Sequence, residues 1–365
     1  MVFWTLTAGC GAHEVLSLGQ RVELASRLSL GPENPPYPDI VSFAEQGASQ
    51  RLYPNQALIL KTWTLADKYT EQELQTLSEW MSHYMDGEPI GVTPDLFERI
   101  ELLRAHGYPW FTTIIPVLGR RASKTFLTGI MFCWQTIRIL SDPRFSRTYA
   151  HRQQPLSILI GATKKEQVLA TLFASYQNMV LNTRWLEPSI IKWNRDRIDF
   201  ISPWDAVAER DSDHPQPSLT VKAVSSNSND VRGGSIIGFV LDEAFFTRTG
   251  DSMFTGDAAI EAARPALNQF GRFSLQMYPS SPWTRTGKVY ELYTAARKQI
   301  SDGGDPALNT TQLESWRLYE GWENGLMLRK DAPSVKTLRM HDEQGRSQVI
   351  LLESAAQPGD RVLLP

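Results

Sequence analysis

The amino-acid sequence predicts an α/β fold with a mostly parallel central sheet flanked by helices. Short apolar runs that suit buried strands alternate with helix-patterned segments between residues 111 and 300, the order that joins parallel strands through helical crossovers. The run 235–241 is apolar without alternation, as expected for a central strand covered on both faces. The length of 365 residues suits one large domain with additions, or two domains.

The pattern divides the chain into three parts. Residues 1–50 are poorly patterned and are assigned to an N-terminal extension, and residues 51–300 to the main α/β domain. Beyond residue 300 the signal weakens, so we interpret residues 301–365 as a linker or the start of a further domain, with a strand or two within 334–352.

Composition excludes several classes of protein. The net charge is −3, so the basic excess of many nucleic-acid binders is absent. Contact with DNA would therefore be made through a local patch, weakly, or by a ring of subunits. The sequence contains no run of about 18 apolar residues, so it predicts no membrane span. The first residues lack the basic and apolar regions of a signal peptide. Cys10 and Cys133 form neither a disulfide framework nor a metal-binding spacing, which favours a reducing, cytosolic compartment.

The first well-patterned segment predicts a helix that starts after Pro54. Its apolar positions recur at helical spacing, and Gln56 would lie in the first turn. A side-chain amide in that place can face a ligand.

Two further helices are expected between this segment and the next strand. Thr70 and Glu73 form a capping box for the first helix. Thr93 is the expected cap of the second, with Pro94 at its first position. Together they predict a helical insertion over about 65–108.

A strand, a tight polar loop and a helix follow in succession. The strand is the apolar run 111–118, and the helix covers 126–140. Backbone N–H groups converge at a helix N-terminus, where the helix dipole favours an anion, and Lys124 adds a full charge. Thr125 would place a hydroxyl on Mg²⁺. The segment could therefore bind a phosphate, although an ordinary turn with a surface lysine has the same pattern.

This loop departs from the standard phosphate-binding pattern G-x-x-x-x-G-K-[ST]. The pattern requires glycine at the positions of Leu118 and Ser123, and one glycine remains, displaced to Gly119. At Ser123 a Cβ would crowd the phosphate cradle, and the conformational freedom of glycine is lost.

The remaining strands and helices alternate. A capping box at Thr163–Glu166 opens a helix with an apolar face through Met179, and a last helix is expected over 287–300. The other expected strands are 156–161, 197–202, 219–225, 235–241 and 273–278.

Two carboxylates, Asp242 and Glu243, end the apolar strand 235–241. Both emerge at the carboxyl edge of the sheet, where ligands bind in open α/β folds. In P-loop ATPases, the enzymes that carry this phosphate-binding pattern, the first acid supports Mg²⁺, and the second activates the attacking water. The alternative is a strand end with two solvated acids.

Two more loops carry polar groups that suit phosphate chemistry. Ser280-Ser281-Pro282 follows a strand, where small hydroxyls can sense a phosphate, although Ser-Pro turns are common. The loop with Arg232 and two glycines leads into the acidic strand, and its arginine could reach a γ-phosphate in cis or from a neighbouring subunit. The other arginines that compete for that role are Arg120, Arg121, Arg248 and Arg264, and any one of them is more often a solvated surface charge.

In this order the motifs resemble the ATPase domain of the large terminase subunit, the DNA-packaging motor of tailed bacteriophages and related viruses. The resemblance covers about residues 52–300. It runs through Tyr53-Pro54-x-Gln56, Gly119 to Thr125, Leu159 to Thr163, Arg232-Gly233, Asp242-Glu243 and Ser280-Ser281-Pro282.

The resemblance implies an ASCE-type P-loop NTPase fold and a set of roles. Gln56 would contact adenine, and Glu243 would be the catalytic carboxylate. Arg232 or Arg121 would be the arginine that stabilises the transition state, and Thr125 with Asp242 would hold Mg²⁺. The residues that would contact the phosphates of ATP are Gly119, Arg120, Ala122, Ser123, Lys124, Thr125 and Ser281.

The same resemblance implies a motor that hydrolyses ATP to move double-stranded DNA into a prohead. Its partners would be a portal protein, a small terminase subunit and further copies of itself in a ring, in the host cytoplasm and away from any membrane. Large terminases usually carry a nuclease domain after the motor, and we assign no nuclease residues because no apolar strand with an acidic cluster follows.

Two alternatives remain open from the sequence. Asp242-Glu243-Ala244-Phe245 also suits a helicase of superfamily 1 or 2, although a second motor domain with its own motifs is not evident. A non-hydrolysing nucleotide-binding assembly module is the other alternative, and Ser123 would be its sign.

Overall fold

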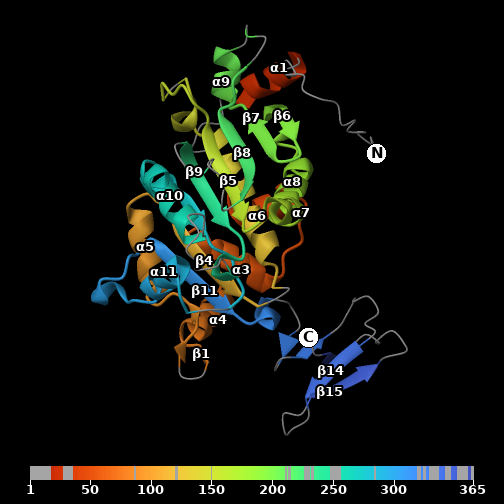
Figure 1. Cartoon of the computed structure of the whole chain (residues 1–365), viewed down its shortest axis with the longest axis vertical. Helices are drawn as coiled ribbons and strands as arrows, with labels where there is room; N and C mark the ends of the chain where they lie inside the picture. The colour runs from red at the N-terminus through yellow and green to blue at the C-terminus, as the bar shows by residue number, and fades with distance from the viewer. Residues whose placement is uncertain are drawn as a thin grey trace.

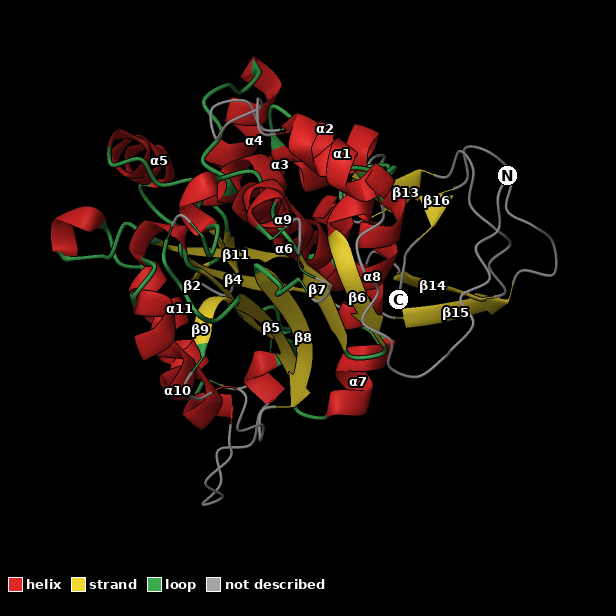
Figure 2. Ribbon diagram, turned by 90° about the horizontal axis from the view of Figure 1, so that it is seen from above, coloured by secondary structure: helices red, strands yellow, loops and turns green. Residues whose placement is uncertain are grey.

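The structure is a computed structural model with helices packed on both faces of one large sheet (Figures 1 and 2). None of the described helices is long and apolar enough to cross a lipid bilayer. The structure describes residues 18–27, 36–85, 88–119, 122–148, 150–209, 212, 215–225, 231, 234–246, 256–282 and 285–318, and short strands at 322–323, 326–328, 337–341, 347–351 and 361–362.

Within the described residues the main sheet has nine strands, in the order β3-β11-β4-β10-β9-β5-β8-β7-β6. The six neighbours from β11 to β8 run parallel, whereas β3 at one edge and β7 and β6 at the other pair antiparallel. The sheet is therefore mixed, with a parallel centre. The strands are β3 (Gly91–Val92), β4 (Thr113–Leu118), β5 (Leu156–Ala162), β6 (Ile190–Asn194), β7 (Arg197–Phe200), β8 (Leu219–Ser225), β9 (Ser235–Leu241), β10 (Leu275–Met277) and β11 (Leu308–Leu313).

Helices cover both faces of this sheet, so its central strands are apolar on both sides (Figure 2). On β4, Ile114 packs in the core cluster that contains α3, α6 and α8, whereas Ile115 packs in the cluster that contains α10 and α11. The helices are α1 (Leu18–Ser26), α2 (Ile40–Ser42), α3 (Pro54–Trp63), α4 (Glu71–Met81), α5 (Leu96–Ala105), α6 (Lys124–Leu140), α7 (Lys165–Ala170), α8 (Leu172–Asn182), α9 (Pro203–Ala208), α10 (Gly256–Asn268) and α11 (Lys288–Ala296).

Several elements match the sequence expectations, and the capping of two helices does not. α4 has the expected capping box. α5, however, begins at Leu96 after Asp95, because Thr93 exchanges hydrogen bonds with Thr310 of β11 and holds the chain in the sheet. The helix expected from Thr163 begins after Lys164 without a side-chain cap, and it breaks at Thr171 into α7 and α8.

The insertion before β4 is not purely helical. β1 (Tyr84–Met85) pairs with β2 (Glu88–Pro89), and β3 joins the main sheet against β11. The fully buried Arg99 on α5 donates to the carbonyls of Asp305, just before β11, and of Leu308, its first residue, so the insertion is fixed to that strand.

The chain after residue 300 contributes to the main sheet and then forms small sheets. β11 lies beside β4, so the sheet extends past residue 300. Strands in 334–352 were expected, and β14 (Thr337–His341) pairs there with β15 (Ser347–Leu351). The remaining described strands are β12 (Trp322–Glu323), β13 (Leu326–Leu328) and β16 (Arg361–Val362).

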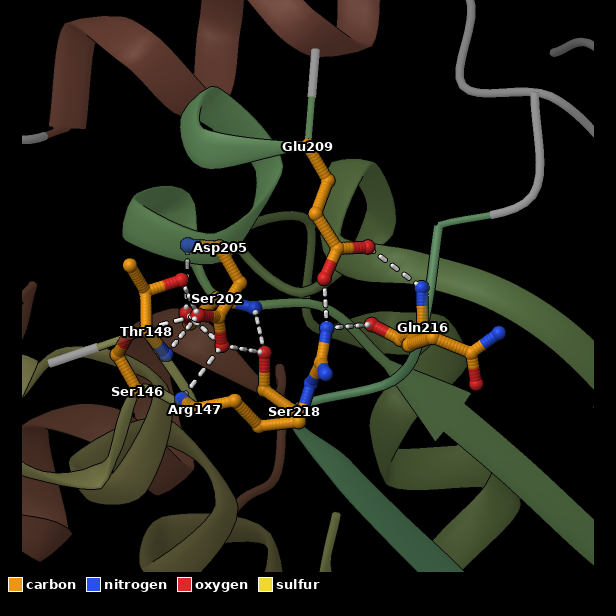
Figure 3. A network of polar contacts seen from close by, with 8 residues as sticks. All are labelled: Ser146, Arg147, Thr148, Ser202, Asp205, Glu209, Gln216 and Ser218. Carbon is orange, nitrogen blue, oxygen red and sulfur yellow. Dashed lines mark hydrogen bonds and ion pairs between the residues drawn. The ribbon is translucent and has the colours of Figure 1, made fainter. Parts of the chain in front are cut away.

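One buried carboxylate, Asp205 on α9, ties together three segments that are distant in sequence (Figure 3). Its two oxygens accept hydrogen bonds from the backbone N–H groups of Arg147 and Thr148 at 3.0 and 2.9 Å. Four hydroxyls also donate to it, those of Ser146, Thr148, Ser202 and Ser218. Although its burial opposes this, these bonds lower the pKa of Asp205 to about 2.

Candidate functional site

The loop between β4 and α6 lies at the carboxyl edge of the sheet, as the sequence predicts. β4 ends at Leu118 and α6 begins at Lys124, so Gly119 to Ser123 connect them. A Cβ on Gly119 would come within 2.4 Å of the Ser315 hydroxyl oxygen, so a larger residue at this position would have to displace the Ser315 side chain. The candidates Arg120 and Arg121 lie outside the described residues.

Lys124 is directed back over this loop. Its side chain is buried, and Nζ donates to the carbonyls of Leu118 and Gly119 at 3.1 Å each and to the hydroxyl oxygen of Ser281 at 3.0 Å. An ammonium group has three N–H donors, so these bonds use its full capacity. The positive charge is therefore held where the loop, the helix start and the Ser-Ser-Pro segment meet.

The acid pair follows β9 at the same edge of the sheet. Asp242 is 4% exposed, and its pKa is raised to about 6, first by burial and then by the neighbouring Glu243 carboxylate. Glu243 is half-buried and has a φ of 52°, in the left-handed region that a residue with a Cβ rarely adopts. Strained backbone of this kind clusters at functional sites.

We expect Asp242→Asn to raise stability at neutral pH. The folded pKa lies above the ordinary value of 3.8, so this carboxyl stabilises the fold fully below that value and loses its contribution as the pH rises through about 6. Removing the buried charge should therefore add roughly 2–3 kcal/mol to the free energy of unfolding at pH 7.5. Urea denaturation in metal-free buffer at pH 7.5 and pH 4.5 measures this.

The gain from Asp242→Asn should shrink at pH 4.5, where the wild-type carboxyl is protonated in the folded state. A variant less stable than wild type at pH 7.5 would show that the ionised carboxylate is favourably bound by the protein itself.

The Ser-Ser-Pro segment connects the loop to the acid pair. The N–H of Ser281 donates to Glu243 Oε2 at 3.4 Å, while the Ser281 hydroxyl accepts from Lys124. Ser280 extends β10 along β4, and its hydroxyl accepts from the N–H of Phe245 at 3.2 Å. Ser280 was not among the predicted site residues, although the Ser-Ser-Pro pattern contains it.

Gln56 reaches the phosphate-loop candidate from the first turn of α3. Its side chain is buried, and Nε2 donates to the Ser123 hydroxyl oxygen at 3.1 Å. Ser123 has a φ of 57°, so the left-handed conformation that glycine would adopt is present despite the Cβ. Ordinary residues adopt it at a cost of about 1–2 kcal/mol.

The structure thus brings together most of the predicted residues that it describes. Lys124, Ser281 and Glu243 form one hydrogen-bonded chain, with Asp242 beside Glu243. Thr125 is half-buried in the first turn of α6, and Ala122 is buried. The candidate Arg232 lies outside the described residues.

Comparisons with known proteins return solved structures of the family that the motifs resemble. No protein-family model and no curated protein sequence matches the chain. The matching solved structures include the large terminase of bacteriophage HK97, which is 16% identical over 68% of this chain and 44% of that one, with a TM-score of 0.37. The large terminase ATPase domain of Thermus phage P74-26 is 16% identical over 61% of this chain and 85% of that one, with a TM-score of 0.37. The large terminase of a thermophilic bacteriophage is 10% identical over 73% of this chain and 46% of that one, with a TM-score of 0.35.

The match spans less than half of the large terminases of HK97 and of the thermophilic bacteriophage.

Proposed function

We propose that this chain is the ATP-hydrolysing motor of viral double-stranded DNA packaging, corresponding to the ATPase domain of a large terminase subunit. One observation carries the proposal. The ammonium of Lys124 and the carboxylate of Glu243 are joined through Ser281, which accepts from the first and donates to the second. A cation for phosphate and a carboxylate for water thus meet at one sheet edge.

The strand order supports the proposed class. In ASCE-type P-loop NTPases an additional strand separates the strand before the phosphate loop from the strand that carries the acids. Here β10 lies between β4 and β9 and pairs parallel with both.

The residues around Asp242 fit a Mg²⁺ ion. Two adjacent carboxylates, one of them buried with a raised pKa, form a site where a divalent cation would offset unfavourable negative charge. Asp242 and the Thr125 hydroxyl would hold the ion with the phosphates, since Mg²⁺ takes oxygen ligands and keeps several waters. The ion, when bound, would neutralise charge on the phosphates of ATP.

The protein side chains would then act as follows. Lys124 would exchange its hydrogen bonds to the loop for the phosphate oxygens, with Gly119, Arg120, Ala122 and Ser123 around them. Glu243 would orient the attacking water and accept its proton. Gln56 would contact adenine, and Arg232 or Arg121 would stabilise the charge on the leaving phosphate.

The proposed partners follow from the proposed role. They are double-stranded DNA, a portal protein, a small terminase subunit and further copies of this chain in a ring, at the prohead portal in the host cytoplasm.

A second candidate function is a nucleotide-binding module that does not hydrolyse. It is favoured by Ser123, whose Cβ stands in the loop where the phosphate-binding pattern has glycine.

Release of inorganic phosphate from ATP, with Mg²⁺ and with EDTA, tests the proposal. We expect phosphate release that depends on Mg²⁺. We also expect that the protein does not unwind a forked duplex. Binding of ATP without phosphate release, in the presence of portal and small subunit, would favour the non-hydrolysing module. Unwinding of the forked duplex would favour a helicase.

A further inference from the structure

The feature behind this inference is the contact between Ser123 and Gln56, which lie 67 positions apart. Ser123 replaces the glycine of the phosphate-loop pattern and keeps the left-handed backbone, with a φ of 57° and a ψ of 21°. Its hydroxyl oxygen accepts a hydrogen bond from Gln56 Nε2 at 3.1 Å. A glycine at this position could not make the contact.

The other end of the Gln56 amide is also held. Its Oε1 accepts from the backbone N–H of Tyr53 at 3.1 Å. Because a backbone N–H can only donate, the amide oxygen must face Tyr53, and the amino group then faces Ser123. The side chain is 2% exposed, so the two bonds define its orientation within a packed environment.

In this orientation the amide keeps one donor and one acceptor site beyond these two bonds. Its NH₂ group has a second N–H, and its oxygen has a second lone pair. Adenine offers a donor at N6 beside an acceptor at N7, which a glutamine amide can pair with through two bonds. Guanine offers acceptors at both O6 and N7, so one bond is replaced by a repulsive pair of acceptors.

We propose that Ser123 is a specificity-determining positioning residue whose hydroxyl holds the Gln56 amide in the orientation that selects adenine over guanine. The inference rests on the proposed function, because it requires that nucleotide binds at this loop. Ser123 acts through Gln56, and the strained backbone at Ser123 accompanies a hydrogen bond that glycine could not provide.

The test compares ATP and GTP binding to wild type, Ser123→Ala and Ser123→Gly by isothermal titration calorimetry with Mg²⁺. Wild type is expected to bind ATP more tightly than GTP. Both variants lack the hydroxyl. In each, the ratio of the dissociation constant for GTP to that for ATP should therefore fall about tenfold from the wild-type value. Thermal melting checks that the variants fold. Ser123→Gly should be the more stable of the two because glycine tolerates the left-handed conformation.

The ratio distinguishes positioning from backbone strain. A loss of selectivity in Ser123→Ala with full selectivity in Ser123→Gly would assign the effect to strain and overturn the proposal, as would unchanged ratios in both variants. If wild type binds ATP without preferring it to GTP, only this inference fails. If wild type binds neither nucleotide, the proposed function fails as well.

Discussion

Glu243→Gln is expected to lower the rate of ATP hydrolysis by about 10²–10⁴-fold, the usual contribution of a positioned general base. Glutamine keeps the size and the acceptor oxygen that meets the Ser281 N–H, but it cannot accept a proton from water. The affinity for ATP should stay within a few-fold of wild type. Phosphate release under saturating ATP measures the rate, and calorimetric titration measures the affinity.

Glu166→Gln is a matched control for this change. Glu166 is an exposed carboxylate in the first turn of α7, after a strand of the same sheet. Its removal should leave the hydrolysis rate unchanged. Equal rates for wild type and Glu243→Gln would show that Glu243 does not take part in hydrolysis. Loss of ATP binding in Glu243→Gln would show that Glu243 acts in binding instead.

The second large effect is expected for Asp205→Asn, which should lower the free energy of unfolding by roughly 3–5 kcal/mol. One oxygen of Asp205 accepts from the N–H of Thr148 and the other from the N–H of Arg147. Whichever way the asparagine amide turns, its NH₂ group faces one of these fixed donors. Urea denaturation at pH 7 measures the loss.

The pH dependence gives an independent check on Asp205. Its folded pKa of about 2 lies below the ordinary value of 3.8, so its stabilising contribution is complete above pH 4 and is lost as the pH falls towards 2. Wild type should therefore lose about 2 kcal/mol more than Asp205→Asn over this range.

Asp196→Asn is the control, because Asp196 is 41% exposed and paired with Lys165 at the surface. Its replacement should cost less than about 1 kcal/mol. Comparable losses for the two aspartates would show that the Asp205 network adds no special stability.

The strands of the sheet centre could be predicted from sequence where burial on both faces leaves a nearly continuous apolar run, as at 111–118 and 235–241. β11 could not, because its buried residues include Asn309, Thr310 and Thr311. The hydroxyl and backbone of Thr310 are satisfied by Thr93 and β4, which a hydrophobic pattern does not reveal. α10 was also missed, since its buried face consists largely of alanines and its interior holds Pro265.

In the candidate site, likewise, some features could be predicted from the sequence and others could not. The lysine after the loop and the acids after the strand follow local patterns, and local patterns survive in a single sequence. The link from Lys124 through Ser281 to Glu243 depends on β10 lying between β4 and β9, which is a property of the strand order. The contact of Gln56 with Ser123 depends on packing between segments 67 positions apart, so no local signal predicts it.

The most direct test of the central claim is the dissociation constant for Mg²⁺-ATP of wild type and Lys124→Met. Methionine keeps most of the buried aliphatic volume and removes the charge that would meet the phosphates. A charge-assisted hydrogen-bonding group of this kind is worth about 1.5–3 kcal/mol. We therefore predict that the variant, while folded by thermal melting, binds ATP roughly 10–100-fold more weakly than wild type. Equal affinity in the two proteins would contradict a nucleotide site at this loop.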